Sequence, residues 1–220
     1  YSYLLQGTNI MFLECAELQP IGTNAYFVAN EDLKQAFVID APLGAFAWAK
    51  SLSDSLGCNL NALLLTHGHW DHILDAHHFA EAGVKVMGHE ADKLLFENPE
   101  VMASFSIPGI EFKGFVIDQW LEENQHLDIA GIEMKVLEVP GHCPGSLLFY
   151  LKKESLAFVG DAIFNRGIGR CDLPGGNFEI LKNSILKKIY SLPNSTTLYS
   201  GHGPKTSVLA EKQENPFVRL

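Results

Sequence analysis

The sequence predicts a layered α/β protein, because short apolar segments typical of buried strands alternate with segments of helical periodicity. The first two strands are expected at residues 24–29 (NAYFVA) and 36–39 (AFVI), on either side of a polar turn. Residues 44–56 then have a helical pattern that ends at Gly57, a residue suited to a helix C-cap. A short apolar run at 62–65 (ALLL) is typical of a buried strand.

The middle of the chain continues this alternation. We expect a helix at residues 73–82, a strand at 84–87 and a helix at 90–98. Residues 99–125 mix Phe, Gly and Pro without a steady period, so no element is predicted there. We expect this segment to overhang a pocket.

The last part of the chain is rich in strands. Four are expected, at residues 127–129, 133–139, 146–151 and 156–159. A helix at 178–190 and a final strand at 196–199 follow them. Each histidine-bearing motif comes directly after a strand, and open α/β sheets place their ligands at the carboxyl ends of strands.

Composition limits the class of protein. The chain has 220 residues, 47% of them hydrophobic, which suits a single domain over residues 1–220 with a sizeable core. The net charge of −10 opposes binding to nucleic-acid backbones, which requires clustered Lys and Arg. No apolar run approaches the ~20 residues that cross a bilayer. Residues 1–7 do not resemble a signal peptide and the four cysteines lack CxxC spacing, so we expect a cytoplasmic protein with free thiols.

The clearest motif is THGHWDH, at residues 66–72. His67 and His69 are two positions apart and can face the same way on extended backbone. Asp71 and His72 fall at the start of the next helix and can face a second ion. Neutral imidazole and carboxylate are ligands for zinc and other first-row divalent metals. In the competing interpretation Asp71 caps a helix and the histidines are ordinary surface residues.

Three further motifs favour the metal site. Each follows an apolar strand and holds one ligand-type residue in a turn bounded by Gly or Pro. These residues are His142 in PGHCPGS, Asp161 in GDAIF and His202 in SGHGP. One such turn is weak evidence, whereas four strand-end motifs in one chain together indicate a metal centre.

The order HGHWDH, PGHCPGS, GDAIF and SGHGP resembles the metallo-β-lactamase superfamily over nearly the whole chain. The resemblance implies a four-layer αβ/βα sandwich, in which two mixed β-sheets are flanked by helices. It also implies two divalent metal ions, with zinc expected and iron or manganese also suitable. His67, His69 and His142 would hold the first ion, Asp71, His72 and His202 the second, and Asp161 would bridge them.

The resemblance also implies how such a site acts. A hydroxide held between the two ions would attack a carbonyl group, and Asp71 and Asp161 are the expected catalytic residues. Asp40 matches an acidic position that supports the ligand shell, although a strand-end cap explains it equally well. Trp70 is expected to pack beside the site. No role is predicted for the remaining histidines, which are His77, His78, His89 and His126.

Residues 160–177 (GDAIFNRGIGRCDLPGGN) resemble the glyoxalase II group, the hydroxyacylglutathione hydrolases, in a short form without the C-terminal helical domain. This resemblance implies hydrolysis of S-D-lactoylglutathione or a related acyl thioester. Arg170 and Arg166 would then contact the anionic glutathione, unless they are solvated surface residues. Asp172 departs from the group, because it stands near a position where longer members have a substrate-binding aromatic residue.

Three other functions compete with the thioesterase. A persulfide dioxygenase on the same fold would hold a single iron through two histidines and one carboxylate. A metal-dependent nuclease would require a basic face, which the acidic balance opposes. A non-enzymatic interaction protein would predict a degraded ligand set, yet every ligand position is filled. The sequence does not define the oligomeric state.

Overall fold

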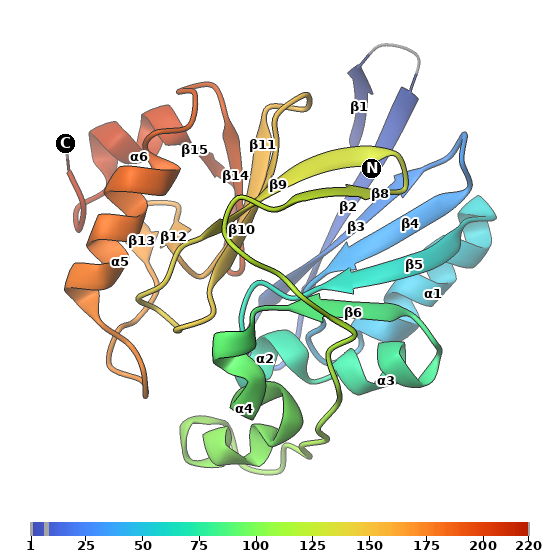
Figure 1. Cartoon of the computed structure of the whole chain (residues 1–220), viewed down its shortest axis with the longest axis horizontal. Helices are drawn as coiled ribbons and strands as arrows, with labels where there is room; N and C mark the ends of the chain where they lie inside the picture. The colour runs from blue at the N-terminus through green and yellow to red at the C-terminus, as the bar shows by residue number, and fades with distance from the viewer. Residues whose placement is uncertain (1, 7–8, 220) are drawn as a thin grey trace.

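The computed structural model describes residues 2–6 and 9–219 of the chain. Tyr1 and Gly7, from the segment that does not resemble a signal peptide, lie outside the described residues. Two mixed β-sheets face each other, and helices cover the outer face of each (Figure 1). The four-layer sandwich predicted from the sequence is therefore confirmed.

The first sheet has its strands in chain order. They are β1 (Ser2–Gln6), β2 (Asn9–Leu18), β3 (Thr23–Asn30), β4 (Gln35–Ile39), β5 (Asn59–Leu64), β6 (Lys85–Gly88) and β7 (Gln119–Trp120). The pairs from β1 to β4 are antiparallel, and those from β4 to β7 are parallel. Helices α1 (Ala45–Leu56) and α3 (Ala76–Glu81) pack on its outer face through a buried cluster that includes Phe27, Leu63 and Phe79.

The second sheet is formed by strands from the later half of the chain. Its order is β15 (Thr206–Ser207), β14 (Thr197–Ser200), β11 (Leu156–Gly160), β10 (Leu147–Leu151), β9 (Ile132–Glu138) and β8 (His126–Ile129). Helix α5 (Phe178–Ser184), the π-helical turn η3 (Ile185–Ile189) and helix α6 (Val208–Glu214) cover its outer face. A separate hairpin pairs β12 (Ile163–Phe164) with β13 (Gly167–Ile168).

Strand β4 shows that the first sheet is buried on both of its faces. Phe37 and Ile39 point into the core between the sheets, while Ala36 and Val38 point into the core under the helices. Successive strand residues alternate between faces, so a strand buried on both sides is a continuous apolar run. Each fully buried large side chain of this kind contributes about 1.5–3 kcal/mol relative to an exposed one.

Most predicted elements are present, and the differences have local causes. The predicted helix at 73–82 is divided into α2 (Trp70–Ile73) and α3, because the N–H of Asp75 donates to the carbonyl of Ala41 instead of continuing the helix. Residues 90–98 form a short 3₁₀ turn, η1 (Glu90–Asp92), before α4 (Lys93–Glu97). Within 99–125 the chain forms the 3₁₀ helix η2 (Pro99–Phe105) and strand β7. None of the helices in the described part has the length and apolar character needed to span a membrane.

Strand direction brings the motifs together. Strands β9, β11 and β14 run the same way, because β10 is antiparallel to both β9 and β11, and β14 is parallel to β11. Their carboxyl ends therefore lie at one edge of the second sheet. At this edge the two sheets are joined, since Leu147 N–H donates to Thr66 O and Asn24 N–H donates to Gly201 O, each at 2.7 Å.

Candidate metal centre

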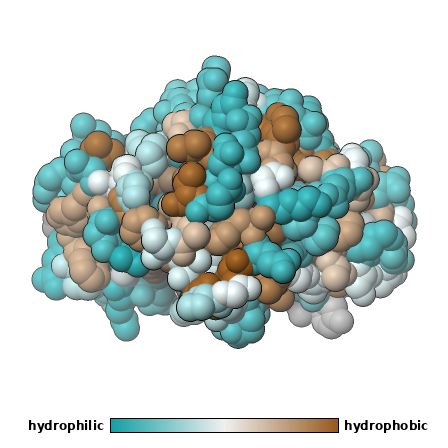
Figure 2. Space-filling model, turned by 90° about the horizontal axis from the view of Figure 1, so that it is seen from below, coloured by the Kyte–Doolittle hydropathy of each residue, from teal (hydrophilic) through white to brown (hydrophobic). Residues whose placement is uncertain are grey.

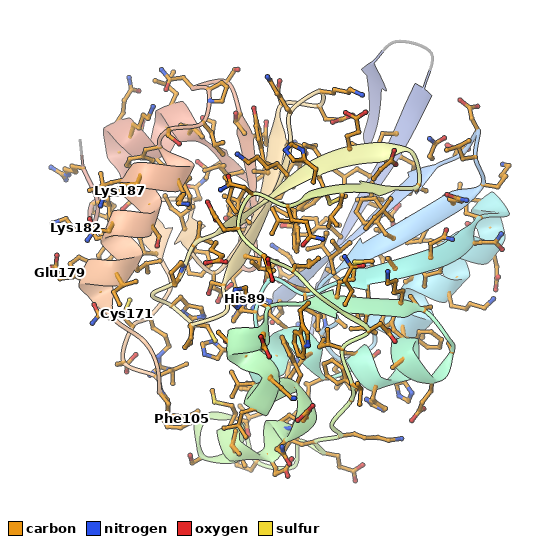
Figure 3. The ribbon with its side chains drawn as sticks, in the orientation of Figure 1. His89, Phe105, Cys171, Glu179, Lys182 and Lys187 are labelled. Atoms are coloured by element: carbon orange, nitrogen blue, oxygen red, sulfur yellow. The ribbon has the colours of Figure 1, made fainter. Side chains whose placement is uncertain are left out.

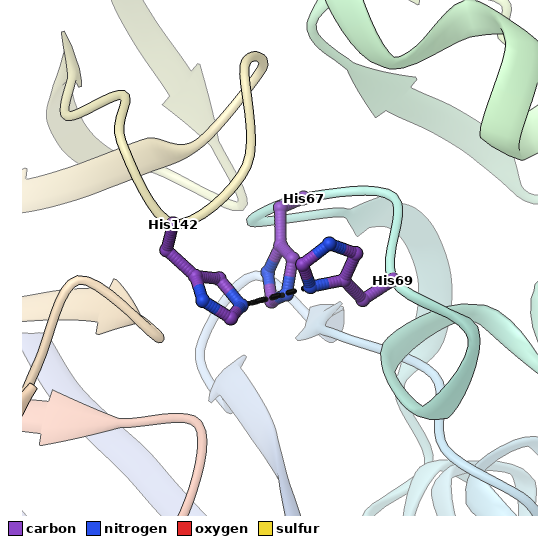
Figure 4. A group of neighbouring side chains, drawn as sticks. All are labelled: His67, His69 and His142. Atoms are coloured by element: carbon purple, nitrogen blue, oxygen red, sulfur yellow. Dashed lines mark hydrogen bonds between the residues drawn. The ribbon is translucent and has the colours of Figure 1, made fainter. Parts of the chain in front are cut away.

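The first group of ligand-type side chains consists of His67, His69 and His142 (Figure 4). His67 and His69 come from the loop after β5, and His142 comes from the loop between β9 and β10. The Nε2 atom of His142 lies 2.8 Å from His69 Nδ1 and 3.2 Å from His67 Nε2. All three side chains are buried. Three converging imidazole nitrogens match the ligand types of a zinc or iron site.

The second group consists of Asp71, His72 and His202. Asp71 and His72 lie in helix α2, and His202 lies in the loop after β14. Asp71 Oδ2 is 3.3 Å from His72 Nε2 and 3.2 Å from His202 Nε2. The hydroxyl of Thr23 donates to the same oxygen at 2.8 Å, which fixes the carboxylate in place.

Asp161, directly after β11, faces both groups. Its Oδ1 lies 3.3 Å from His72 Nε2, and its Oδ2 lies 3.6 Å from His142 Nε2. His72 Nε2 and Asp161 Oδ1 are buried and form no hydrogen bond. Buried polar atoms without partners are rare in folded proteins. Cations placed between these side chains would satisfy them, so the donor set fits a pair of divalent metal ions.

Asp40 lies behind the second group and orients it. Its carboxylate accepts hydrogen bonds from the N–H and the hydroxyl of Thr66, each at 2.8 Å. Its Oδ2 also lies 2.8 Å from Nδ1 of His72. A proton on Nδ1 of that ring leaves Nε2 free to bind a metal, so Asp40 has the position of a residue that sets the tautomer of His72.

The buried environment controls the charges of the histidines. Burial lowers the pKa of His69 to about 3 and lowers the pKa of His67 well below its usual value. Both rings are thus neutral, as metal ligands must be. Burial also acts to lower the pKa of His72, but the surrounding carboxylates, that of Asp71 foremost, outweigh it and raise this pKa well above its usual value. His72 therefore holds a proton where His67 and His69 do not.

A cavity of about 450 Å³ opens onto the two groups. Five of the ligand-type residues line it, and the other side chains around it are Ile21, Trp70, Phe105, Ser106, Ile107, Phe164, Ile168, Arg170 and Leu173. Trp70 is buried and packs against Leu74 and Met102 beside the site. Segment 99–125 contributes Phe105, Ser106 and Ile107 to the cavity, so the structure places part of this segment at the pocket as expected from the sequence.

The structure brings one of the two expected substrate-binding arginines to the pocket. Arg170 lines it, and its guanidinium forms a two-pronged ion pair with Asp172, with two N–O distances of 2.7 Å. Arg166 is not among the residues around the cavity, because its side chain turns to α6 and pairs with Glu214, with Nε 2.7 Å from the carboxylate.

Residues given no role in the sequence analysis also lie outside the cavity lining. Among them, His89 contacts Glu138, with 3.2 Å between the ring and the carboxylate. All four cysteines are free thiols, as predicted.

The sequence analysis missed Asp92, which connects two ligand-bearing loops. This buried carboxylate accepts hydrogen bonds from Gly68 N–H at 2.8 Å and Gly145 N–H at 2.7 Å. The Cys143 thiol also donates to it, at 3.2 Å. Its sequence position gave no signal, since an Asp at the start of a predicted helix has an ordinary explanation in capping and the helix dipole.

A two-sheet sandwich with imidazole and carboxylate side chains clustered at one edge defines a metalloenzyme, and comparison with known proteins identifies its family. A model of the metallo-beta-lactamase superfamily matches residues 18–202. The hydroxyacylglutathione hydrolase GloC of Haemophilus influenzae is 39% identical over 195 residues, covering 86% of this chain and 89% of that protein. The chain therefore belongs to the metallo-beta-lactamase superfamily.

Two solved structures agree with this assignment. The BLEG-1 B3 metallo-beta-lactamase is 34% identical, with a TM-score of 0.86 over 94% of this chain and 99% of that chain. The protein TTHA1623, solved in a di-iron-bound form, is 33% identical, with a TM-score of 0.79 over 93% of this chain and 100% of that chain. The second of these binds iron, so the fold is compatible with metals other than zinc.

Proposed function

We propose that this protein is a metal-dependent thioester hydrolase of the glyoxalase II type, with S-D-lactoylglutathione as the first substrate to test. The observation that carries this proposal is the position of Asp161 between the two groups: its carboxylate lies 3.3 Å from His72 and 3.5 Å from His202 of the second group, and 3.6 Å from His142 of the first. The similarity to a hydroxyacylglutathione hydrolase supports the same reaction class.

In this proposal His67, His69 and His142 would hold one divalent ion, Asp71, His72 and His202 would hold another, and Asp161 would be shared between them. When bound, two such ions lower the pKa of water and polarise a carbonyl oxygen. The ligands differ in charge, since the first group has only neutral imidazoles while the second includes a carboxylate. Zinc, iron and manganese all suit this set.

The chain's own contribution to hydrolysis is to position the attacking water beside its carboxylates. Water adds across the carbon–sulfur bond, so its oxygen joins the acyl carbon and a proton goes to the departing sulfur. Asp71 and Asp161 are the carboxylates beside this position. Burial acts to raise the pKa of Asp161, but the neighbouring histidines, His72 foremost, outweigh it and keep the pKa below its usual value. Asp161 is therefore ionised, the state in which a carboxylate holds a cation, and its lowered pKa makes it a weak base.

A covalent mechanism through a side chain has little support in this pocket. Ser106 is the one Ser or Cys among the described residues around the cavity. Its hydroxyl donates to the carbonyl of Ala103 at 2.9 Å, and no base is paired with it. An unactivated serine is a weak nucleophile, which leaves water as the attacking group.

The test measures hydrolysis of S-D-lactoylglutathione by protein of known metal content. We expect turnover that depends on bound metal and falls at least about 100-fold in Asp161→Ala. Asp128→Ala, which removes an exposed carboxylate from β8, is the matched control and should keep wild-type turnover. Oxygen uptake with glutathione persulfide, without thioester hydrolysis, would instead identify the dioxygenase alternative.

A further inference from the structure

Half of the side chains that line the cavity at the proposed metal centre, seven of fourteen, are apolar. Phe105 and Ile107 line the cavity from the end of η2 and the residues just after it, and Ile21 lines it from the turn between β2 and β3. Phe164, Ile168 and Leu173 form the wall on the side of the β12–β13 hairpin and the loop after it. Figure 2 looks onto the face that carries η2 and shows hydrophobic side chains gathered near its middle, among hydrophilic ones.

Three of these side chains are left uncovered in the free protein. Ile21, Phe105 and Ile107 have exposed fractions of 46%, 43% and 39%. Phe105 lies at the outer end of η2, in the lower part of Figure 3. Apolar side chains that line a cavity and remain exposed are covered when a ligand with apolar surface binds.

The wall formed by η2 is fixed relative to the proposed metal ligands. Met102, within η2, is buried in a cluster with Trp70 and Leu74. Trp70 stands between His69 and Asp71 in the sequence, so the same cluster holds both the wall and the ligand loop. Leu173, from the loop after β13, packs against this cluster too. The apolar lining is therefore held in a fixed position relative to the proposed metal ligands.

The cavity offers no free basic side chain to an anionic carrier. Arg170 is the one Lys or Arg among the described residues around it, and its guanidinium is paired with Asp172. Lys182 and Lys187 project from the outer side of α5 and η3 (Figure 3), away from the cavity. Glutathione has two carboxylates, whose transfer from water to an apolar wall is unfavourable without a partner.

We propose that, within the thioester hydrolase function proposed above, the cavity selects acyl thioesters whose acyl chain and thiol carrier are uncharged and apolar. The carbonyl and sulfur would lie at the proposed metal centre, and the apolar groups would cover Phe105 and Ile107. A polar, charged carrier such as glutathione would leave these side chains uncovered or lose hydration against them.

The experiment measures hydrolysis by the metal-loaded protein of four thioesters, which combine each of two acyl groups with each of two thiol carriers. The substrates are the D-lactoyl and hexanoyl thioesters of glutathione and of N-acetylcysteamine, a short uncharged thiol. Each methylene buried in an apolar site favours binding by about threefold to fourfold. We therefore expect kcat/KM for hexanoyl-N-acetylcysteamine to exceed that for D-lactoylglutathione by at least about tenfold.

Two variants test the residues named. The double variant Phe105→Ser, Ile107→Ser should reduce the ratio of hexanoyl to D-lactoyl kcat/KM by about tenfold, because it removes apolar contact area from one wall. Asp172→Asn, which frees Arg170, should shift the carrier ratio toward glutathione by about threefold. Val116→Ser changes an apolar residue that is 70% exposed and outside the cavity lining, so both ratios should stay at wild-type values.

A binding measurement separates selection from chemistry. Calorimetry with the unreactive thioethers S-hexyl-N-acetylcysteamine and S-hexylglutathione should show tighter binding of the uncharged compound. Equal or better kcat/KM and affinity for the glutathione compounds would overturn the selectivity inference and leave the hydrolase standing. No hydrolysis of any of the four thioesters would instead refute the proposed function.

Discussion

The carboxylate of Asp92 accepts a hydrogen bond from the backbone N–H of Gly68, with 2.8 Å between Oδ2 and the nitrogen. Gly68 separates His67 from His69. The other carboxylate oxygen accepts from Gly145 N–H at 2.7 Å, in the loop that carries His142. A single buried side chain thus holds together the two loops that supply the first group of histidines.

This relationship predicts the effect of Asp92→Asn. An amide has one acceptor oxygen, so one of the two backbone N–H groups would lose its partner and face an NH₂ group. We expect a loss of about 2 kcal/mol in unfolding free energy, or about 4–8 °C in Tm. We also expect weaker metal binding, because the two loops are no longer held in register. Differential scanning calorimetry and metal analysis measure the two effects.

Asp75→Asn is the matched control for this prediction. Asp75 is also buried, but its carboxylate accepts one backbone hydrogen bond, from Phe46 N–H at 3.0 Å. An amide oxygen can replace that acceptor, so the Tm should change little and the metal content not at all. If Asp92→Asn lost stability but bound metal as tightly as the wild type, Asp92 would have a purely structural role.

The contrast between Asp92 and Asp161 shows what the sequence can reveal. Asp161 directly follows an apolar strand in a Gly-bounded turn, so its own neighbours indicate its place at a sheet edge. Asp92 acts on residues 24 and 53 positions away, and nothing adjacent to it encodes those contacts. Ligand-type residues and strand ends are local signals in the sequence, whereas hydrogen bonds that connect distant loops exist only in the folded chain.

The secondary-structure elements show the same difference between local sequence signals and contacts that form only in the fold. Strand β4 and the second half of β5 are buried on both faces and form continuous apolar runs, and these runs were predicted, whereas the polar and partly exposed first half of β5 was not. Strand β2 includes Glu14 and Glu17 among its apolar residues and was not predicted, because its pairing with β1 and β3 decides its structure. The orientation of Arg166 likewise depends on Glu214, which is far along the chain and next to it only in the fold.

A second prediction concerns the tautomer of His72. In Asp40→Asn, an NH₂ group facing Nδ1 of His72 would favour the ring with its proton on Nε2, the atom that faces Asp71 and Asp161. We expect affinity for the second ion to fall about 10–100-fold. Asn tolerates the left-handed backbone of position 40, where φ is 61°, so strain does not explain a loss. Competition with a chromophoric chelator measures the affinity, and unchanged binding of both ions would refute the role of Asp40.

A third prediction uses the close approach of Gly201 to the site. A Cβ atom at this position would lie 2.1 Å from Asp161 Oδ1 and 2.5 Å from Cε1 of His72. Gly201→Ala should therefore displace the Asp161 carboxylate and lower thioester hydrolysis at least about 100-fold. Gly203→Ala is the control, since a Cβ there meets nothing within 4 Å although φ is 71°. That variant should lose about 1–2 kcal/mol of stability from backbone strain and retain its metal.

The last prediction concerns the pH dependence of metal binding, because protons and metal ions compete for the same imidazole nitrogens. The lowered pKa values of His67 and His69 mean that neither ring is protonated at pH 6, so the first ion displaces no proton from them. Burial acts to lower the pKa of His202, but the hydrogen bond to Asp71 together with the charges of Asp161 and Asp71 raises it above its usual value, and the pKa of His72 is raised too. These two rings hold protons at pH 6 that the second ion must displace. Lowering the pH from 8 to 6 should therefore reduce the affinity for the second ion by up to about tenfold per pH unit for each proton displaced. The affinity for the first ion should fall less. Metal titrations should show two ions bound per chain at pH 8 and a number closer to one at pH 6. If the affinities for both ions fell equally, the difference in protonation between the two groups would be contradicted.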